Sequence, residues 1–261
     1  MMQRLTIAAV ALLAVLFAGT ERAAAERLVT SISRHQVLVN SSFTGTAIVL
    51  FGTVEPDSPT ARRREGYDLV VTVTGPRQTV VAHRKERMLG IWTNVGSRTF
   101  LNVPSYLAIL SNQPLDQIAD AGIARSQQLG LADKLLPQQL GGNVGDVGRD
   151  DPFRANFIRL KTQHGLYVQR TNGVTLLTPT VFRAEIPLPA VAPIGNYDVD
   201  VKLFADGRSL TRTNSAFEIV KVGFEQFVAT AAQDYGLLYG ITTAMMAIMT
   251  GWFAAVVFRR D

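Results

Sequence analysis

Apolar and polar residues alternate along two stretches of this chain, and a period of two residues predicts β-strands in both. In the first stretch, residues 26–111, the segment 67–74 places Leu69, Val71 and Val73 on one face. Residues 166–221 show the same alternation. The predicted strands cover residues 37–39, 46–54, 67–74, 79–88, 100–103, 106–110, 166–170, 174–177, 180–186, 197–203 and 209–220. Short strands separated by turns indicate a mainly β fold with one or more immunoglobulin-like sandwich regions.

The period changes between these stretches, and residues 112–165 are expected to form a helical linker or insertion. That region is expected to hold helices over 114–129 and 131–140 and a flexible joint over 141–150. Asp151-Pro152 then supplies the cap and first-turn proline of a further helix, which Gly165 ends.

Two arrangements of the β regions stay open at this point. Either two small β-domains are joined by a helical linker, or one sandwich carries a helical insertion. We favour two domains, because each β region has its own alternating runs. Within the second region, Thr171-Asn172-Gly173 predicts a hairpin between the strands on either side of it.

The carboxyl-terminal residues 235–258 contain no charged side chain and predict a transmembrane helix. At about 1.5 Å per residue such a helix is about 36 Å long, which exceeds a bilayer core of about 30 Å. An amphipathic juxtamembrane helix over 222–234 is expected to lead into it. Arg259 and Arg260 in the tail, residues 259–261, predict a cytoplasmic carboxyl terminus.

Residues 1–25 have the pattern of a secretory signal peptide. Arg4 precedes an apolar run too short to span a bilayer, and Ala23-Ala24-Ala25 supplies a cleavage site. The two ends together predict a single-pass protein of the inner membrane with most of its chain in the periplasm.

Small residues recur on one stripe of the predicted span and could let a second helix approach closely in lipid. The expected packing residues are Gly236, Gly240, Ala244, Ala247, Gly251 and Ala255. A membrane-protein partner, or self-association through this helix, is therefore expected. Ordinary glycine and alanine content of a span is the competing interpretation.

Composition excludes several kinds of function. The chain has no cysteine, so it can form no disulfide and no thiolate metal site. Its formal net charge of +5 is too small to indicate a nucleic-acid partner.

Candidate chemistry is weak. The three histidines, His35, His83 and His164, lack the local spacing of a metal site. Glycines 142, 145 and 148 lack the other features of a phosphate loop, and Asp198 and Asp200 alternate with apolar residues as on a solvated strand. We therefore predict no catalytic residues, no metal and no cofactor.

Arg84, Lys85 and Arg87 stand shortly before Trp92 and, like the run at 62–64, are candidates for a patch that binds anionic groups, lipid headgroups or the acidic surface of a partner. The competing interpretation is a solvated loop in an arginine-rich protein.

Several segments resemble a family of putative transmembrane proteins from alphaproteobacteria, most specifically GIW at 90–92 and GWFAAVVFRR at 251–260. The resemblance covers nearly the whole chain. It implies an inner-membrane anchor without an assigned activity, and an association with multi-span exporters of the sulfite or sulfonate type, hence an accessory role.

Two functions follow as hypotheses. The first is a membrane-anchored, non-enzymatic partner-binding or accessory subunit of an inner-membrane complex, such as one for transport. The second is a periplasmic enzyme or solute-binding module with its site between the two β regions and the helical segment as a lid.

Overall fold

The structure is a computed structural model that describes residues 26–56, 66–88, 90–140, 143–223, 228 and 232–258. The expected signal peptide, the basic run at 62–64 and the basic tail lie outside the described residues, as does much of the expected juxtamembrane helix.

Strands form most of the described chain. They are β1 (Arg27–Ile32), β2 (Gln36–Val39), β3 (Gly45–Glu55), β4 (Asp68–Thr74), β5 (Arg77–Met88), β6 (Ile91–Pro104), β7 (Leu107–Ser111), β8 (Pro137–Leu140), β9 (Asn143–Asp146), β10 (Tyr167–Thr171), β11 (Val174–Leu176), β12 (Val181–Pro189), β13 (Gly195–Ala205) and β14 (Arg208–Lys221). The helices are α2 (Leu115–Ile118), α3 (Ala121–Ser126), the 3₁₀ turn η1 (Leu131–Asp133), α4 (Pro152–Gln163) and α6 (Gly236–Val257). The predicted fold class, mainly β with one carboxyl-terminal apolar helix, is confirmed.

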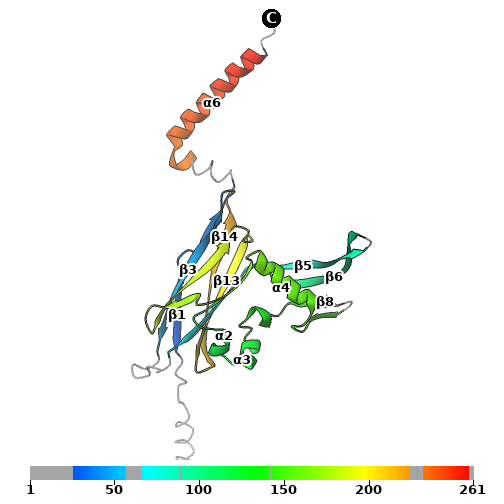
Figure 1. Ribbon diagram of the computed structural model, residues 1–261. Helices are drawn as coiled ribbons and strands as arrows, with labels where there is room; N and C mark the ends of the chain where they lie inside the picture. Colours follow the sequence, from blue (N-terminus) through cyan, green and yellow to red (C-terminus); the bar gives the residue numbers. More distant parts are fainter. Residues whose placement is uncertain are drawn as a thin grey trace, which may run out of the picture.

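Among the described residues the strands form three sheets, with orders β1-β3-β12-β11, β10-β7-β4-β13-β14-β2 and β5-β6-β8-β9. We call them sheets A, B and C. Sheets A and B enclose one hydrophobic cluster, to which Leu50, Val71, Phe182 and Val201 belong. These two sheets, with the residues between them, are called the two-sheet core below (Figure 1).

The strands of the two β regions pair with one another in this core. Strand β3 pairs with β12 from Val181↔Thr53 to Pro189↔Gly45, and β4 pairs with β13. This interleaving corrects our preference for two separate β-domains. Alternation showed that each strand has a buried face, but it carried no information about which strand covers that face.

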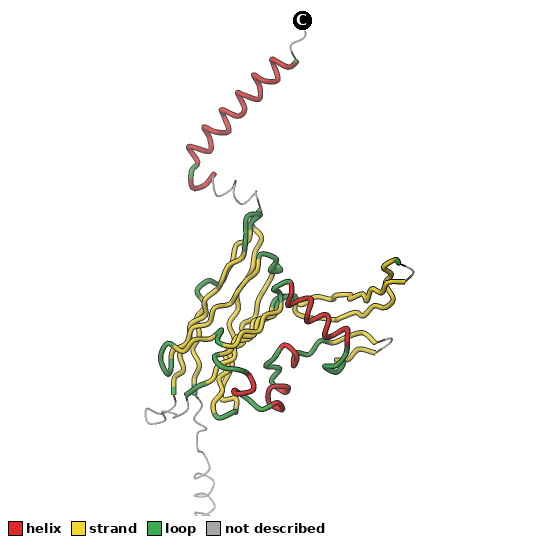
Figure 2. The backbone as a smooth tube through the Cα atoms, in the orientation of Figure 1, coloured by secondary structure: helices red, strands yellow, loops and turns green. Residues whose placement is uncertain are grey.

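Strand β4 lies between two cores. Leu69, Val71 and Val73 belong to the cluster between sheets A and B, whereas Val70 belongs to a second cluster on the opposite face of sheet B. Residues from the inserted region, including Ile118, Leu129 and Phe157, complete the second cluster. We call α2, α3, η1, α4 and sheet C, which cover this face, the outer layer (Figure 2).

The inserted region differs from its prediction in three places. The expected helix over 114–129 is broken at Ala119, which is extended and separates α2 from α3. Residues 137–140 form β8, with Pro137 at the first strand position that proline tolerates. Residues 143–146 form β9, which pairs with β8, so this part of the expected joint is a strand. Helical spacing had marked buried positions without establishing that the helix is continuous.

The predicted helix that starts at Asp151 is confirmed. The side chain of Asp151 accepts a hydrogen bond from the backbone nitrogen of Arg154 at 3.0 Å, and Pro152 occupies the first turn.

The prediction of a hairpin at 171–173 is wrong. Strand β10 pairs in parallel with β7 in sheet B, whereas β11 pairs with β12 in sheet A. The left-handed Asn172 therefore turns the chain from one sheet to the other.

Candidate functional site

The predicted basic patch lies on a long hairpin that projects from the body of the protein. Strands β5 and β6 pair from Arg77↔Pro104 to Met88↔Ile91, and Figure 1 shows this hairpin extending to one side. The pairing brings Arg84, Lys85, Arg87 and Trp92 to its outer half, with Arg87 directly opposite Trp92. We call residues 84–88 and 90–95 the arm tip.

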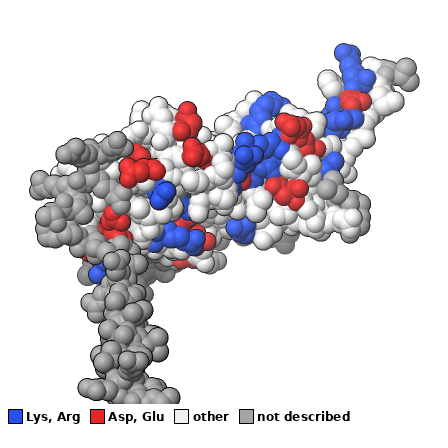
Figure 3. All heavy atoms as spheres, turned by 90° about the horizontal axis from the view of Figure 1, so that it is seen from below, with Lys and Arg blue, Asp and Glu red and all other residues white. Residues whose placement is uncertain are grey.

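The arm tip is apolar as well as basic. Met88, Ile91 and Trp92 are 56%, 69% and 67% exposed. Arg84 pairs with Glu86 at 2.9 Å, whereas among the described residues no carboxylate pairs with Lys85 or Arg87. Lys and Arg side chains mark the projecting part of the surface in Figure 3. Large apolar side chains beside unpaired cations are typical of a surface that binds something.

Helix α4 holds the base of the hairpin. Phe157 of α4 stacks on Phe100 of β6 with ring centroids 4.4 Å apart, and Arg98 lies 5.0 Å above the ring of Phe153. Phe157 also meets the buried Tyr167 edge-on at 5.9 Å. These contacts fix α4 against sheet C at one side of the hairpin.

A groove of about 560 Å³ runs between α4 and β5. It combines apolar residues with cations, and no aspartate or glutamate lines it. Its lining comprises Val80, Val81, Ala82, His83, Arg84, Lys85, Pro152, Phe153, Asn156, Phe157, Arg159, Leu160, Lys161, His164 and Leu166. The structure thus adds Arg159, Lys161 and His164 to the predicted residues Arg84 and Lys85, while Arg87 and Trp92 lie farther out on the hairpin.

Sequence reasoning missed Arg159 and Lys161 because they stand some 75 positions away from the patch along the chain. One signal was present. The helix 152–163 carries Arg154, Arg159 and Lys161 and no acidic residue.

Lys161 lies at the inner end of the groove. Its ammonium is 5.7 Å from the ring centroid of Phe157 and 5.9 Å from that of Tyr167, and it donates to the carbonyl of Ser105 at 3.4 Å. Burial lowers the pKa of Lys161. Because no described carboxylate neutralises it, an anion in the groove would find a partly desolvated cation there.

A buried arginine anchors α4 from its other side. Arg154 is 3% exposed, pairs with Asp146 at 2.5 Å and donates to the carbonyls of Ala132 and Lys134. Arg154 thereby connects α4 to β9 and to the chain beside η1.

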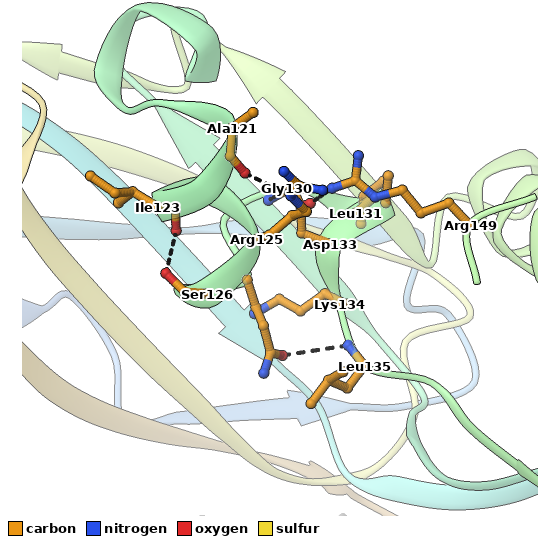
Figure 4. Close-up of polar contacts among 12 residues, drawn as sticks. Ala121, Ile123, Arg125, Ser126, Gly130, Leu131, Asp133, Lys134, Leu135 and Arg149 are labelled. Atoms are coloured by element: carbon orange, nitrogen blue, oxygen red, sulfur yellow. Dashed lines mark hydrogen bonds and ion pairs between the residues drawn. The ribbon is translucent and has the colours of Figure 1, made fainter. Parts of the chain in front are cut away.

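The chain around η1 is held by polar contacts in turn. Asp133 accepts from the backbone nitrogen of Gly130 at 3.3 Å and pairs with Arg149 (Figure 4). Helix α4, which forms one wall of the groove, is therefore held in place by polar contacts to β9 and to the chain around η1.

The other candidate residues do not come together as a reaction centre. His83 and His164 line the groove, but His35 lies beside β2, and nowhere in the described ranges do three metal-ligand side chains gather. Asp200 lies 3.7 Å from Lys202, and Asp198 is exposed. A second, polar hollow of about 580 Å³ is lined by residues between Gln169 and Glu185. All its lining residues come from the second β region, so it does not lie between the two β regions.

The predicted span is helix α6, and within the described chain it is the one helix long and apolar enough to cross a membrane. Every residue of α6 is exposed. The hydroxyls of Thr242, Thr243 and Thr250 donate hydrogen bonds to backbone carbonyls of the preceding turn. These polar groups therefore need no water as a hydrogen-bond partner. A Cβ atom added at Gly236, Gly240 or Gly251 would meet nothing within 4 Å, so no described residue covers the predicted packing stripe at these glycines.

Residues 27–260 match the family described as "Putative transmembrane protein (Alph_Pro_TM)". The chain belongs to this family. Membership agrees with the span α6 and confirms the resemblance noted in the sequence. The family and the helix together fit a membrane-anchored protein.

No curated protein matches the chain. A solved structure that aligns with it is the N-terminal domain of the Streptococcus gordonii adhesin Sgo0707, at 8% identity and a TM-score of 0.26. The alignment covers 74% of this chain and 32% of the adhesin chain, and similarity at this level carries no argument about fold or function.

Proposed function

We propose that this protein is a non-enzymatic accessory subunit that α6 tethers to an inner-membrane complex, with its folded region in the periplasm and its carboxyl terminus in the cytoplasm. The observation that carries the proposal is α6, an apolar helix of 22 residues that packs against no described part of its own chain. Gly236, Gly240 and Gly251 lie on one stripe of this helix, and no described residue covers them. In lipid such a surface favours close packing against another helix.

The projecting hairpin supports a binding role. A hairpin with exposed Ile91 and Trp92 contributes little apolar burial to its own chain, so its composition is better explained by a contact with another molecule.

Disulfide cross-linking tests the membrane contact, because the natural chain has no cysteine to interfere. Ala247→Cys places a thiol on the stripe. Met249→Cys is the matched control, since two residues rotate the side chain by about 200° around the helix. Oxidation of native membranes should cross-link the first variant, to itself or to a cysteine-bearing membrane protein, and leave the second as a monomer. Equal behaviour of the two variants would contradict a specific packing face.

Reporter fusions test the orientation. A carboxyl-terminal green fluorescent protein should fluoresce, whereas alkaline phosphatase at the same position should be inactive. The reverse pattern would place the carboxyl terminus outside and overturn the assignment of the folded region to the periplasm.

A further inference from the structure

The free edge of a strand forms one side of the groove. Strand β5 is the last strand of sheet C, and within the described ranges its only pairing partner is β6. Such an edge presents backbone N–H and C=O groups that can pair with an added strand.

The groove reaches this edge. All six consecutive residues from Val80 to Lys85 line it. Side chains in a strand point alternately to opposite faces, so lining by neighbours of both parities brings the groove against the backbone of β5.

The dimensions suit an extended chain. Six residues of β5 cover about 20 Å at 3.3 Å per residue, and the 12 residues of α4 cover about 18 Å at 1.5 Å per residue. A groove between a helix and a strand with a free edge is a geometry in which peptides bind by adding a strand.

Charge and polarity define the occupant. The charged lining residues are Arg84, Lys85, Arg159 and Lys161, all of them cationic, and Phe157, Leu160 and Leu166 supply apolar surface. Edge cations hinder pairing with neutral or basic strands, but they attract an acidic one.

We propose that the groove between α4 and β5 binds an extended acidic segment of a partner protein, which pairs with the edge of β5 as an added strand. Apolar side chains of that segment would contact α4, and its carboxylates would meet Lys85, Arg159 and Lys161. This inference rests on the proposed accessory role and names its binding site and the chemistry of the partner.

The test uses the full chain in phosphatidylcholine nanodiscs and two fluorescein-labelled octapeptides, one of alternating Glu and Val and one of alternating Gln and Val. The acidic peptide should bind at least about tenfold more tightly, as measured by fluorescence anisotropy. Bound peptide should also slow hydrogen exchange of the amides of residues 80–85, which is a specific sign of strand addition.

Charge reversal locates the site. The double variant Lys85→Glu/Arg159→Glu should weaken binding of the acidic peptide by about tenfold or more. The control Arg208→Glu/Lys221→Glu changes the net charge equally at exposed positions of β14 and should retain full affinity. Circular dichroism of both variants checks that they are folded.

Three results would overturn the inference: no saturable binding, binding that leaves the β5 amides unprotected, or equal affinity for the two peptides. Preferential binding of phosphatidylglycerol vesicles that is lost in the groove variant, without peptide binding, would assign the cations to lipid instead. Cross-linking through Ala247→Cys does not involve the groove. A failure of the peptide test would therefore leave the proposed membrane contact unaffected, and a failure of the cross-linking test would leave the peptide result unaffected.

Discussion

Strands β4 and β5 follow one another in the chain, and both carry adjacent valines, yet their surroundings differ completely. In β4 every residue from Leu69 to Val73 is buried, with one face toward the two-sheet core and the other toward the outer layer. In β5 only Val80 and Ala82 are partly buried, and the rest of the strand is exposed. The comparison separates residues that hold the fold together from residues free to bind.

The largest expected effect lies in the two-sheet core. Phe182 is fully buried, and its ring lies directly over Gly52, where an added Cβ would come within 2.3 Å of it. Phe182→Ala should lower the free energy of unfolding by about 3–5 kcal/mol, because the vacated volume cannot close. Thermal or denaturant unfolding of the full chain in detergent measures the change.

The arm tip supplies the contrasting control for that experiment. Trp92→Ala removes a larger side chain that is already solvated, so the unfolding free energy should change by less than about 0.5 kcal/mol. A loss as large as that of Phe182→Ala would show that the tip is packed in solution, and the comparison would fail.

A smaller effect is expected in the outer layer. Arg154→Met removes a buried cation, leaves the carbonyls of Ala132 and Lys134 without their donor, and leaves Asp146 with the backbone N–H of Leu136 but without its ion pair. We expect a loss of about 3 kcal/mol, as for a buried pair that is broken on one side. Arg159→Met on the exposed face of the same helix is the matched control and should cost less than about 0.5 kcal/mol. Similar losses in both variants would remove the assigned anchoring role of Arg154.

Lys134 provides a pH test of the outer layer. Burial, assisted by the nearby Lys202, lowers the pKa of Lys134 to about 8 from its ordinary 10.5, while Asp200 opposes the shift. Between these two values the unfolded chain holds a proton that the folded chain has released, so stability rises with pH over this window. From pH 7.5 to 9.5 the gain should be about 1–2 kcal/mol for a partly exposed group.

Lys134→Met should remove the contribution of Lys134 to that gain, leaving a smaller rise from Lys161 and Lys202, whose pKa values burial also lowers, and it should be the more stable protein near pH 7. Unfolding midpoints of both proteins measured across the window provide the check. An identical pH dependence in the two would mean that Lys134 keeps its ordinary pKa in the folded chain.

The smallest expected effect concerns the end of α4. Gly165 has φ 68°, and a Cβ there would come no closer than 3.9 Å to Pro189, so Gly165→Ala adds conformational strain without a clash. A loss of about 1 kcal/mol is expected. Gly148→Ala, in open space, should be nearly neutral. A neutral Gly165→Ala would indicate that the chain readjusts where α4 ends.

The sequence alone predicted the strands of the two-sheet core other than β1, the capped helix at Asp151 and a span over 235–258, because alternation, capping and continuous hydrophobicity are local properties. It also located Arg84, Lys85, Arg87 and Trp92 as the candidate patch. Only the tertiary structure decided that β3 pairs with β12, that Asn172 turns the chain between sheets, and that α4 brings Arg159 and Lys161 opposite β5. Pairing between distant segments depends on which surfaces exclude water together, and a local pattern contains no information about that choice.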